Sequence, residues 1–489
     1  MHPDEKVLDT FSWRPIGILC LGVVAVLLAV APRYGWHRDE LYFLEAGRHL
    51  AWGYLDQPPF APFVAHLADA VAPGNLVVLR LLPAITTAVT IGLGAALVRE
   101  FGGRRGGQIA GAAAVAGGGF ILGVGHLLST AAFDLTAWMA LLWVTARLLR
   151  TDDTRWWLAF GAIAGVSMLN KNLLVLLAAA LLCGLVLERR WTLLTSPWLL
   201  AGGAVALVIA APNLLWQAHH GWPQIEMARV LSRRLATENR VTLIPFQILL
   251  VGPGLIWILW RGARWLGGNP EGAPFRALLW AWPAGLGAAF ITGGRPYYVV
   301  PLTTTVMLAG VVAAERTGRV RRLAWFIIPT AVVGLPISLP LLPISTVNIT
   351  AKANQAVAET VGWPELTRQV ADVVRSLPPN ERSSVVLLAA SYGEAGALDR
   401  FGRDLGLPHA FSGQNSYADF RQPTDDAATV VAVRYRTTAL APYFERCDQV
   451  GSVDNGRNVA NEAQGTPILV CRGLRGTWTG VWPRLRFLA

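Results

Sequence analysis

The sequence predicts a polytopic α-helical membrane protein with a C-terminal extracytoplasmic α/β domain. Of its 489 residues, 53% are hydrophobic and only 15% are charged, whereas the charged share of soluble globular chains is about a quarter. Apolar runs of spanning length recur up to about residue 343, and after residue 349 short apolar, strand-like runs alternate with helix-like segments. This composition excludes an ordinary soluble globular protein.

Eleven apolar runs are candidates for membrane spans, because each approaches the roughly 20 residues that cross about 30 Å of hydrocarbon. The first run has no small-residue cleavage site after it, so we predict a retained span rather than a signal peptide. The runs at 156–170 and 172–187 are short and meet at "LNKN". A tight outer hairpin is therefore the alternative to two full spans there. The runs lie near residues 16–32, 76–98, 108–126, 131–149, 156–170, 172–187, 194–213, 244–260, 276–292, 298–314 and 322–343.

The basic residues are concentrated in the membrane part. Residues 1–349 hold 27 Lys and Arg against 17 Asp and Glu, whereas residues 350–489 hold 15 against 14. With a cytoplasmic N-terminus the arginine clusters fall in inner loops, as the positive-inside rule expects, and an odd number of spans places the C-terminal domain outside. The sequence therefore predicts a multi-pass cell-membrane protein whose positive charge meets anionic lipid, with no nucleic-acid partner.

The predicted domains are a transmembrane domain at residues 1–349, with its first outer loop at 33–75, and an α/β domain at 350–489. In the latter, "GWPELTRQVADVVRSLP" and "GEAGALDRFGRDLG" have helical patterns, and "SSVVLLAAS" and "TVVAVRY" have strand patterns. Cys447 and Cys471 also lie there. Two thiols in a small domain outside the cell suit a disulfide, but sequence alone leaves their pairing open.

The first outer loop begins with "WHRDELYFLEAGRHLAWGYLDQPPF", a charged and aromatic cluster directly after an apolar run. Its apolar spacing and the double proline predict amphipathic helices at the membrane surface. Asp39 and Glu40 diverge by about 100° on a helix, so one can face a cavity while the other bonds to protein. The alternatives are an aromatic belt with solvated acids or a structural ion pair with Arg38 or Arg48.

Several further segments follow in an order that is typical of one family. After "RDELYFLEAGRHLAWGYLDQPPFAP" come "FDLTAWMALLW", "GVSMLNKNLL", "NLLWQAHHGWP", "GGRPYYVVPL", "ETVGWPELTRQVA" and "SYGEAGALDRFG". Together they resemble the GT-C fold polyprenyl-phosphate-sugar glycosyltransferases of the family 39 type, which includes protein O-mannosyltransferases and the lipid A aminoarabinose transferase. The resemblance implies a multispan domain with an outward-facing active site, a C-terminal extracytoplasmic domain and a donor whose sugar is carried on a polyprenyl phosphate.

Transfer from such a donor requires a base for the acceptor hydroxyl and positive or hydroxyl groups for the departing phosphate. By resemblance, Asp39 is the catalytic base and Glu40 orients it or the acceptor. Lys171, Arg295, Tyr297 and Tyr298 are the predicted phosphate-binding residues, Tyr298 through the Pro-x-Tyr-x-x-Pro pattern. The alternative for Lys171 is that its side chain extends to the membrane interface to keep the ammonium in water. The alternative for Arg295 and the two tyrosines is that they only anchor the chain at that interface.

A last group of residues is predicted to bind the donor sugar or the acceptor: Asp134, Asp56, His219, Tyr392 and Glu394. Asp134 at the start of a span is costly unless it faces a cavity or a partner, although a helix N-terminal acid is an equal alternative. Tyr392 and Glu394 follow a predicted strand, where a plain turn is as good an explanation. The adjacent His219 and His220 are too few for a metal site, so no metal or cofactor is firmly implied and a divalent cation is the weaker alternative.

The sequence thus predicts a polyprenyl-phosphate-sugar-dependent hexosyl- or pentosyltransferase that inverts the anomeric centre by direct displacement. Its expected partners are the lipid-linked donor, membrane lipids and a lipid, cell-wall glycan or protein acceptor. The main alternative is a transporter or flippase of lipid-linked sugars, although no duplicated pattern relates the halves of the chain. A non-catalytic scaffold is the third. The sugar, the acceptor and the oligomeric state are not specified by these residues.

Overall fold

The computed structural model describes residues 8–489, apart from the side chain of Leu250. Its contacts divide the chain into two compact units. The membrane unit contains the chain up to Val30, Arg80–Trp222 and Ala228–Leu339, and the loop–sheet unit contains Ala31–Leu79, Pro223–Met227 and Pro340–Ala489. The first outer loop therefore folds in one unit with the C-terminal α/β region. The predicted cytoplasmic N-terminus lies outside the described residues.

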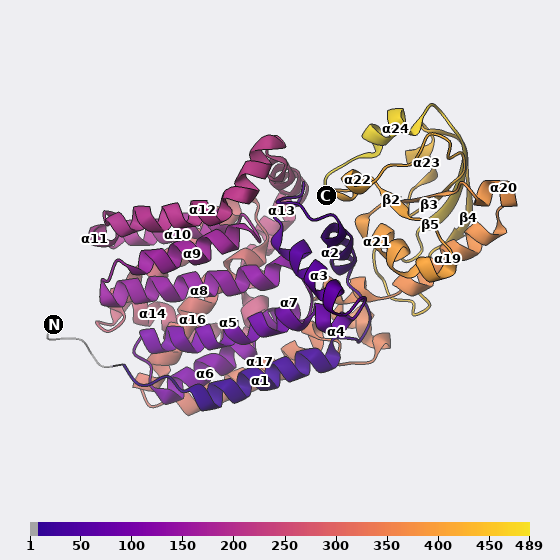
Figure 1. The fold of residues 1–489 in the computed structure, drawn as a ribbon. Coiled ribbons are helices and arrows are strands. Elements are labelled where there is room, and N and C mark those ends of the chain that lie inside the picture. The colour runs from indigo at the N-terminus through magenta and orange to yellow at the C-terminus, as the bar shows by residue number, and fades with distance from the viewer. Residues whose placement is uncertain (1–7) are drawn as a thin grey trace. The chain divides into compact units, whose positions relative to one another are not determined.

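Helices account for all eleven apolar runs. In the membrane unit, neighbouring helices such as α1, α5, α8 and α9 lie side by side (Figure 1). The helices of this unit are α1 (Trp13–Val30), α5 (Leu81–Glu100), α6 (Arg105–Ala116), α7 (Gly119–Gly125), α8 (Thr130–Thr151), α9 (Trp156–Met168), α10 (Leu174–Leu187), α11 (Trp191–Leu194), α12 (Pro197–His219), α13 (Pro223–Val251, whose first turn belongs to the loop–sheet unit), α14 (Ile256–Gly268), α15 (Arg276–Thr292), α16 (Val300–Arg316) and α17 (Ala324–Ser338).

The number of full spans differs from the eleven predicted. Among the described residues, six helices are long and apolar enough to cross a membrane, or up to eight when each of two bent pairs is one span. The pair α6 and α7 bends by 63°, and the pair that contains α13 and α14 bends by 74°. Helices α9 and α10 have only 13 and 14 residues, about 20 Å of helix at 1.5 Å per residue. Hydropathy detected apolar segments but not where the backbone breaks.

Close helix packing in the membrane unit depends on glycine at particular crossings. A Cβ atom on Gly161 of α9 would lie 2.0 Å from the carbonyl oxygen of Gly202 in α12, and a Cβ atom on Gly202 would lie 2.2 Å from that of Trp157. Any larger side chain at either position forces the helices apart. Such small-residue contacts are a common way for membrane helices to associate, because lipid supplies no hydrophobic driving force between them.

Two helices begin the loop–sheet unit, as predicted for the first outer loop: α2 (Arg38–Arg48) and α3 (Phe60–Val71), followed by the short α4 (Leu76–Leu79). A capping box starts α2, in which His37 and Glu40 satisfy backbone N–H groups at the helix N-terminus. The face of α2 that includes Leu41, Tyr42 and Leu44 is buried. The helix is therefore packed into the unit rather than lying free on its surface.

The C-terminal region is a five-stranded sheet in the order β2-β1-β3-β5-β4. β1, β2 and β3 are parallel, and β5 and β4 add an antiparallel edge. This confirms the predicted α/β class, with helices at both predicted helical segments. The elements are α18 (Val347–Thr350), α19 (Trp363–Ser376), α20 (Pro379–Arg382), β1 (Val386–Ala389), α21 (Tyr392–Phe401), β2 (Ala410–Ser412), α22 (Tyr417–Phe420), β3 (Val430–Val433), α23 (Thr437–Leu440), β4 (Phe444–Ser452), β5 (Pro467–Leu474) and α24 (Trp478–Leu485).

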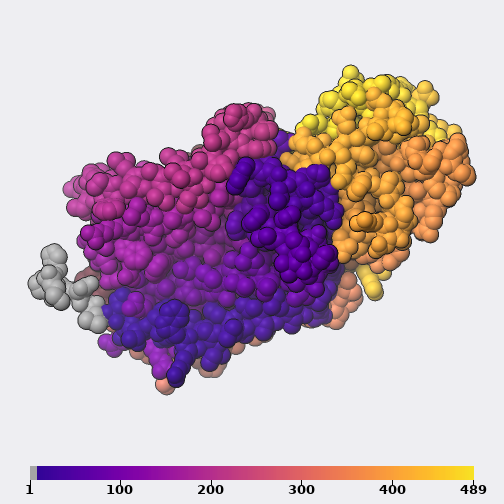
Figure 2. All heavy atoms as spheres, in the orientation of Figure 1, coloured from indigo at the N-terminus to yellow at the C-terminus, as the bar shows by residue number. Residues whose placement is uncertain are grey.

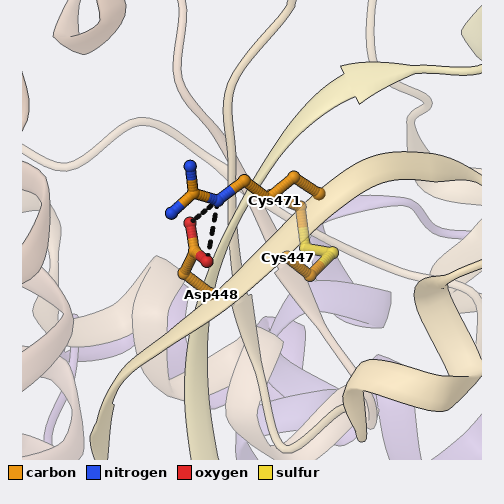
Figure 3. The surroundings of a disulfide bond; sticks show 4 residues. Cys447, Asp448 and Cys471 are labelled. Atoms are coloured by element: carbon orange, nitrogen blue, oxygen red, sulfur yellow. Dashed lines mark hydrogen bonds and ion pairs between the residues drawn. A yellow bond between two sulfur atoms is a disulfide. The ribbon is translucent and has the colours of Figure 1, made fainter.

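A disulfide joins the two strands of the antiparallel edge. Cys447 of β4 and Cys471 of β5 are register partners, and their sulfur atoms are bonded (Figure 3). The sequence left this pairing open, because their proximity depends on a strand register that local patterns do not reveal. A structural disulfide is typical of proteins folded in an oxidising compartment.

We expect the double substitution Cys447→Ser and Cys471→Ser to destabilise the sheet. The bond closes a loop across a sequence separation of 24, for which chain entropy gives about 3 kcal/mol. Pulse proteolysis in denaturant, with cleavage followed in the C-terminal region, measures this difference. Cys183→Ser at an exposed free thiol is the control, and equal stability of the double variant and the wild type would contradict the expectation.

Candidate functional site

Asp39 lies near the start of α2 and is partly accessible. Its side chain is 33% exposed. The hydroxyl of Tyr392 donates a hydrogen bond to its Oδ1 at 2.9 Å, and the Nε atom of Arg38 lies 3.7 Å from the same oxygen. Asp39 is thus oriented by a phenol and a guanidinium while part of its carboxylate faces outward.

Glu40 has a different environment from its neighbour. The residue is fully buried, and its Oε2 accepts a hydrogen bond from the backbone N–H of His37 at 2.8 Å. Arg48, the other predicted ion-pair partner of these acids, instead lies 2.9 Å from Glu45. The predicted divergence of the two acids is therefore realised, with Asp39 accessible and Glu40 holding the N-terminus of α2.

A chain of charged side chains connects α2 with the sheet. Arg38 Nη1 lies 2.7 Å from Glu462, and Arg434 lies 3.0 Å from both Glu462 and Glu394. Glu394 is buried in α21, two residues after Tyr392. The ion pairs thus fix both partners of the Asp39 carboxylate, Arg38 from the loop and Tyr392 from the sheet region.

Tyr392 is held in the protonated form that can donate to Asp39. Burial raises the pKa of its phenol well above the usual value, and the negative charge of Asp39 raises it further. Its ring also stacks on that of Tyr42, with centroids 4.6 Å apart. These contacts make Tyr392 a positioning residue for the carboxylate.

Asp56 joins the same cluster through Tyr42. The Tyr42 hydroxyl donates to Asp56 Oδ1 at 2.7 Å, and Asn415 donates to Oδ2 at 3.3 Å. Burial and the neighbouring charge of Asp39 raise the pKa of Asp56 from 3.8 to about 6, although the two hydrogen bonds oppose the shift. Asp56 therefore changes its charge in a weakly acidic range.

This shift gives a pH dependence to stability that Asp56→Asn should remove. As pH rises from about 4 to about 6, the unfolded chain releases this proton while the folded chain keeps it, so the folded state loses stability. A shift of roughly two units corresponds to at most about 3 kcal/mol, lost by pH 6–7. Denaturant unfolding of both proteins between pH 4 and pH 7 measures the effect. Parallel pH profiles would contradict it.

A second cluster lies in the membrane unit around Lys171, between α9 and α10. The Lys171 ammonium donates to the hydroxyl of Tyr297 at 3.1 Å. It also lies 5.1 and 5.0 Å from the ring centroids of Tyr297 and Tyr298, close enough for cation–π attraction. The structure thus brings together three of the four predicted phosphate-binding residues.

Asp134 and Arg295 are electrostatic neighbours of this cluster. Asp134 is buried in α8, and the charge of Lys171 acts on it; it is the fifth residue of the helix, beyond the first turn that the dipole alternative favours. Arg295 is exposed at the start of the 3₁₀ turn Pro296–Val299, and its charge acts on Tyr298. The Lys171 cluster therefore contains one amine, two phenols, one carboxylate and an exposed guanidinium.

His219 is the predicted residue that joins neither cluster. It is exposed at the last position of α12. Across residues 8–489, no three His, Cys, Asp or Glu side chains are grouped as metal ligands. The divalent cation considered from the His pair gains no support from this arrangement and stays a prediction.

Sequence reasoning missed the residues that join the loop to the sheet. Arg38 entered only as an alternative ion-pair partner, and Tyr42 only as part of the aromatic belt. Glu462 and Asn415 meet Arg38 and Asp56 across more than 350 residues, and Arg434 meets Glu462 from a separate loop. No local pattern marks such residues.

Residues 56–216 match the family model described as dolichyl-phosphate-mannose-protein mannosyltransferase. ArnT from Cupriavidus metallidurans bound to undecaprenyl phosphate has a TM-score of 0.61 and 17% identity, over 93% of this chain and 97% of that chain. The chain has the GT-C membrane fold. The resemblance predicted from the sequence is thereby confirmed.

Two other solved structures with the GT-C fold are also similar to this chain. ArnT from the same organism in the apo state has a TM-score of 0.60 and 15% identity, again over 93% of this chain and 97% of that chain. The arabinofuranosyltransferase AftD from Mycobacteria has a TM-score of 0.52 and 12% identity, over 96% of this chain and 42% of that chain. No match is found among curated protein sequences.

Proposed function

We propose that the protein is a membrane glycosyltransferase that moves a sugar from a polyprenyl-phosphate donor to an acceptor hydroxyl. The observation that carries the proposal is the Asp39 carboxylate, accessible and oriented by Tyr392 and Arg38. The GT-C fold and the match to the mannosyltransferase family model support it. ArnT was solved with undecaprenyl phosphate, and we extend that carrier class to the donor of this chain.

From the chemistry of each cluster taken by itself, we assign the proton acceptor to the loop–sheet unit and the phosphate-binding groups to the membrane unit. Asp39 accepts the proton of the acceptor hydroxyl, whose oxygen forms a bond to the anomeric carbon. The bond between that carbon and the phosphate oxygen breaks, and polyprenyl phosphate leaves with the electron pair. Lys171, Tyr297, Tyr298 and Arg295 stabilise its charge, while Asp134 bonds a sugar or acceptor hydroxyl. One displacement inverts the anomeric centre.

The finer assignments form part of the same proposal. We assign a hexosyl or pentosyl donor, a multi-pass topology with the C-terminal domain extracytoplasmic, and a positioning role for Tyr392. Glu394 was predicted to bind the sugar or acceptor, but it is buried in an ion pair with Arg434 and is assigned no such contact. The Cys447–Cys471 disulfide supports the extracytoplasmic side, since cytosolic thiols are kept reduced. The domain division predicted from the sequence, with a boundary at residue 349, stays part of this proposal.

The test is transfer by purified protein in proteoliposomes. Synthetic polyprenyl-phosphate donors with hexose or pentose groups are supplied together with lipid, glycan and peptide acceptors, and products are identified by mass spectrometry. The proposal predicts a glycoside and free polyprenyl phosphate in equal amounts. A flippase would move donor between leaflets and form no glycoside, and that result would overturn the proposal.

A further inference from the structure

One segment of the membrane unit has a charge pattern that the transfer reaction does not use. Residues 228–240 of α13, "ARVLSRRLATENR", carry four arginines and one glutamate. All four arginines are exposed. Arg229, Arg233 and Arg240 fall within about 40° of one another around the helix, and Arg234 lies about 100° from Arg233. We name Arg229, Arg233, Arg234 and Arg240 the α13 arginine face. In Figure 2, the magenta segment that contains α13 reaches the surface.

The arginine face ends where the helix becomes apolar. Residues 241–260 contain no Asp, Glu, Lys or Arg. Val241 and Ile244 are 72% and 56% exposed, which suits hydrocarbon and not water. Four exposed guanidinium groups therefore come directly before exposed aliphatic side chains on one continuous helix. That order is typical of a helix passing from lipid headgroups into the bilayer core.

The arginine face also lies at the end of the membrane unit that holds the Lys171 cluster. Ser232 and Asn239 donate to the carbonyl oxygens of Thr292 and Gly293 at 2.9 and 2.7 Å. Arg240 donates to those of Phe290 and Ile291. Arg295 and Tyr297 follow within a few residues of these carbonyls, so the arginines are fixed at the same membrane surface as the proposed phosphate site.

We propose that the α13 arginine face binds the headgroups of anionic phospholipids, such as phosphatidylglycerol, in the leaflet next to the Lys171 cluster. Guanidinium groups form paired hydrogen bonds with phosphate oxygens, and clustered arginines on an amphipathic helix attract anionic lipid. With the predicted topology, this surface is the outer one, where the positive-inside rule disfavours arginine. The arginines of α13 therefore have a role other than setting the orientation of the protein in the membrane.

The test measures which lipid is adjacent to α13. A fluorophore is attached to the full chain after Thr237→Cys at an exposed position, with Cys20→Ala and Cys183→Ala removing the free thiols. The protein is reconstituted in phosphatidylcholine vesicles with a minor share of spin-labelled phosphatidylglycerol or phosphatidylcholine. We expect about twofold stronger quenching by phosphatidylglycerol, and this preference should fall toward parity in about 0.5 M salt.

The variant R229Q/R233Q/R234Q should abolish the preference. Arg240 is kept because it bonds the end of α15. The matched control R319Q/R321Q/R322Q removes three exposed arginines near the start of α17 and should leave the preference unchanged. Equal quenching by both lipids in the parent, or an undiminished preference in the α13 variant, would overturn the inference. So would complete loss of the preference on adding inorganic phosphate at constant ionic strength, which would indicate a site for free phosphate.

The quenching assay contains neither the sugar donor nor the sugar acceptor of the transfer reaction. Its outcome is therefore independent of whether the protein transfers a sugar, and a failed transfer assay leaves the inference intact.

Discussion

We expect Asp39→Asn to lower kcat for sugar transfer by about 10²–10⁴-fold, the usual contribution of a general base. The substitution keeps the shape of the side chain and an oxygen that accepts the Tyr392 hydrogen bond. It removes only the ability to take a proton. Because the donor phosphate is bound by other groups, the KM for donor should change little, which separates loss of chemistry from loss of binding.

The measurement is single-turnover transfer in proteoliposomes, together with donor binding by isothermal titration. Asp404→Asn, at an exposed acid in the same unit, is the matched control and should retain wild-type transfer. Tyr392→Phe should give an intermediate loss, because it removes the orienting hydrogen bond but leaves the carboxylate. Asp39→Asn protein that keeps wild-type kcat would remove Asp39 from the role of base.

Lys171→Met should weaken both donor binding and transfer. The ammonium is the cationic centre of the Lys171 cluster, and it interacts with Tyr297 and with the carboxylate of Asp134. Methionine keeps the length of the side chain but removes the charge that offsets the departing phosphate. Loss of one such group typically lowers kcat by about 10²–10³-fold, so kcat/KM for donor should fall by at least this factor.

Lysine is rare enough in this chain to provide a clean control. Lys352 is the other lysine among the described residues, and it is exposed in the loop–sheet unit. Lys352→Met should transfer sugar at the wild-type rate. Lys171→Arg should recover part of the activity, since a guanidinium restores charge with a different geometry. If Lys171→Met binds undecaprenyl phosphate as tightly as the wild type, the phosphate role is wrong.

The candidate site was predictable only where its residues belong to local motifs. The adjacency of Asp39 and Glu40 predicted that one acid would face outward, and the capping box explains which one is buried. Lys171 was predicted to bind phosphate as a rare cation between two spans, and Tyr298 through the Pro-x-Tyr-x-x-Pro pattern of the resemblance; the structure brings the two together. The hydrogen-bond partner of Asp39 was not predictable, since Tyr392 is separated from it by 353 residues in the sequence.

The sequence by itself determined the class of the molecule. An apolar composition requires a membrane environment, since so few charged groups cannot cover a soluble surface, and the strand and helix periods after residue 349 require an α/β region. Tertiary structure alone decided two features: the pairing of Cys447 with Cys471, and the packing of the first loop with the sheet region. Each depends on contacts between distant segments, and hydropathy and helical or strand periodicity describe only neighbours along the chain.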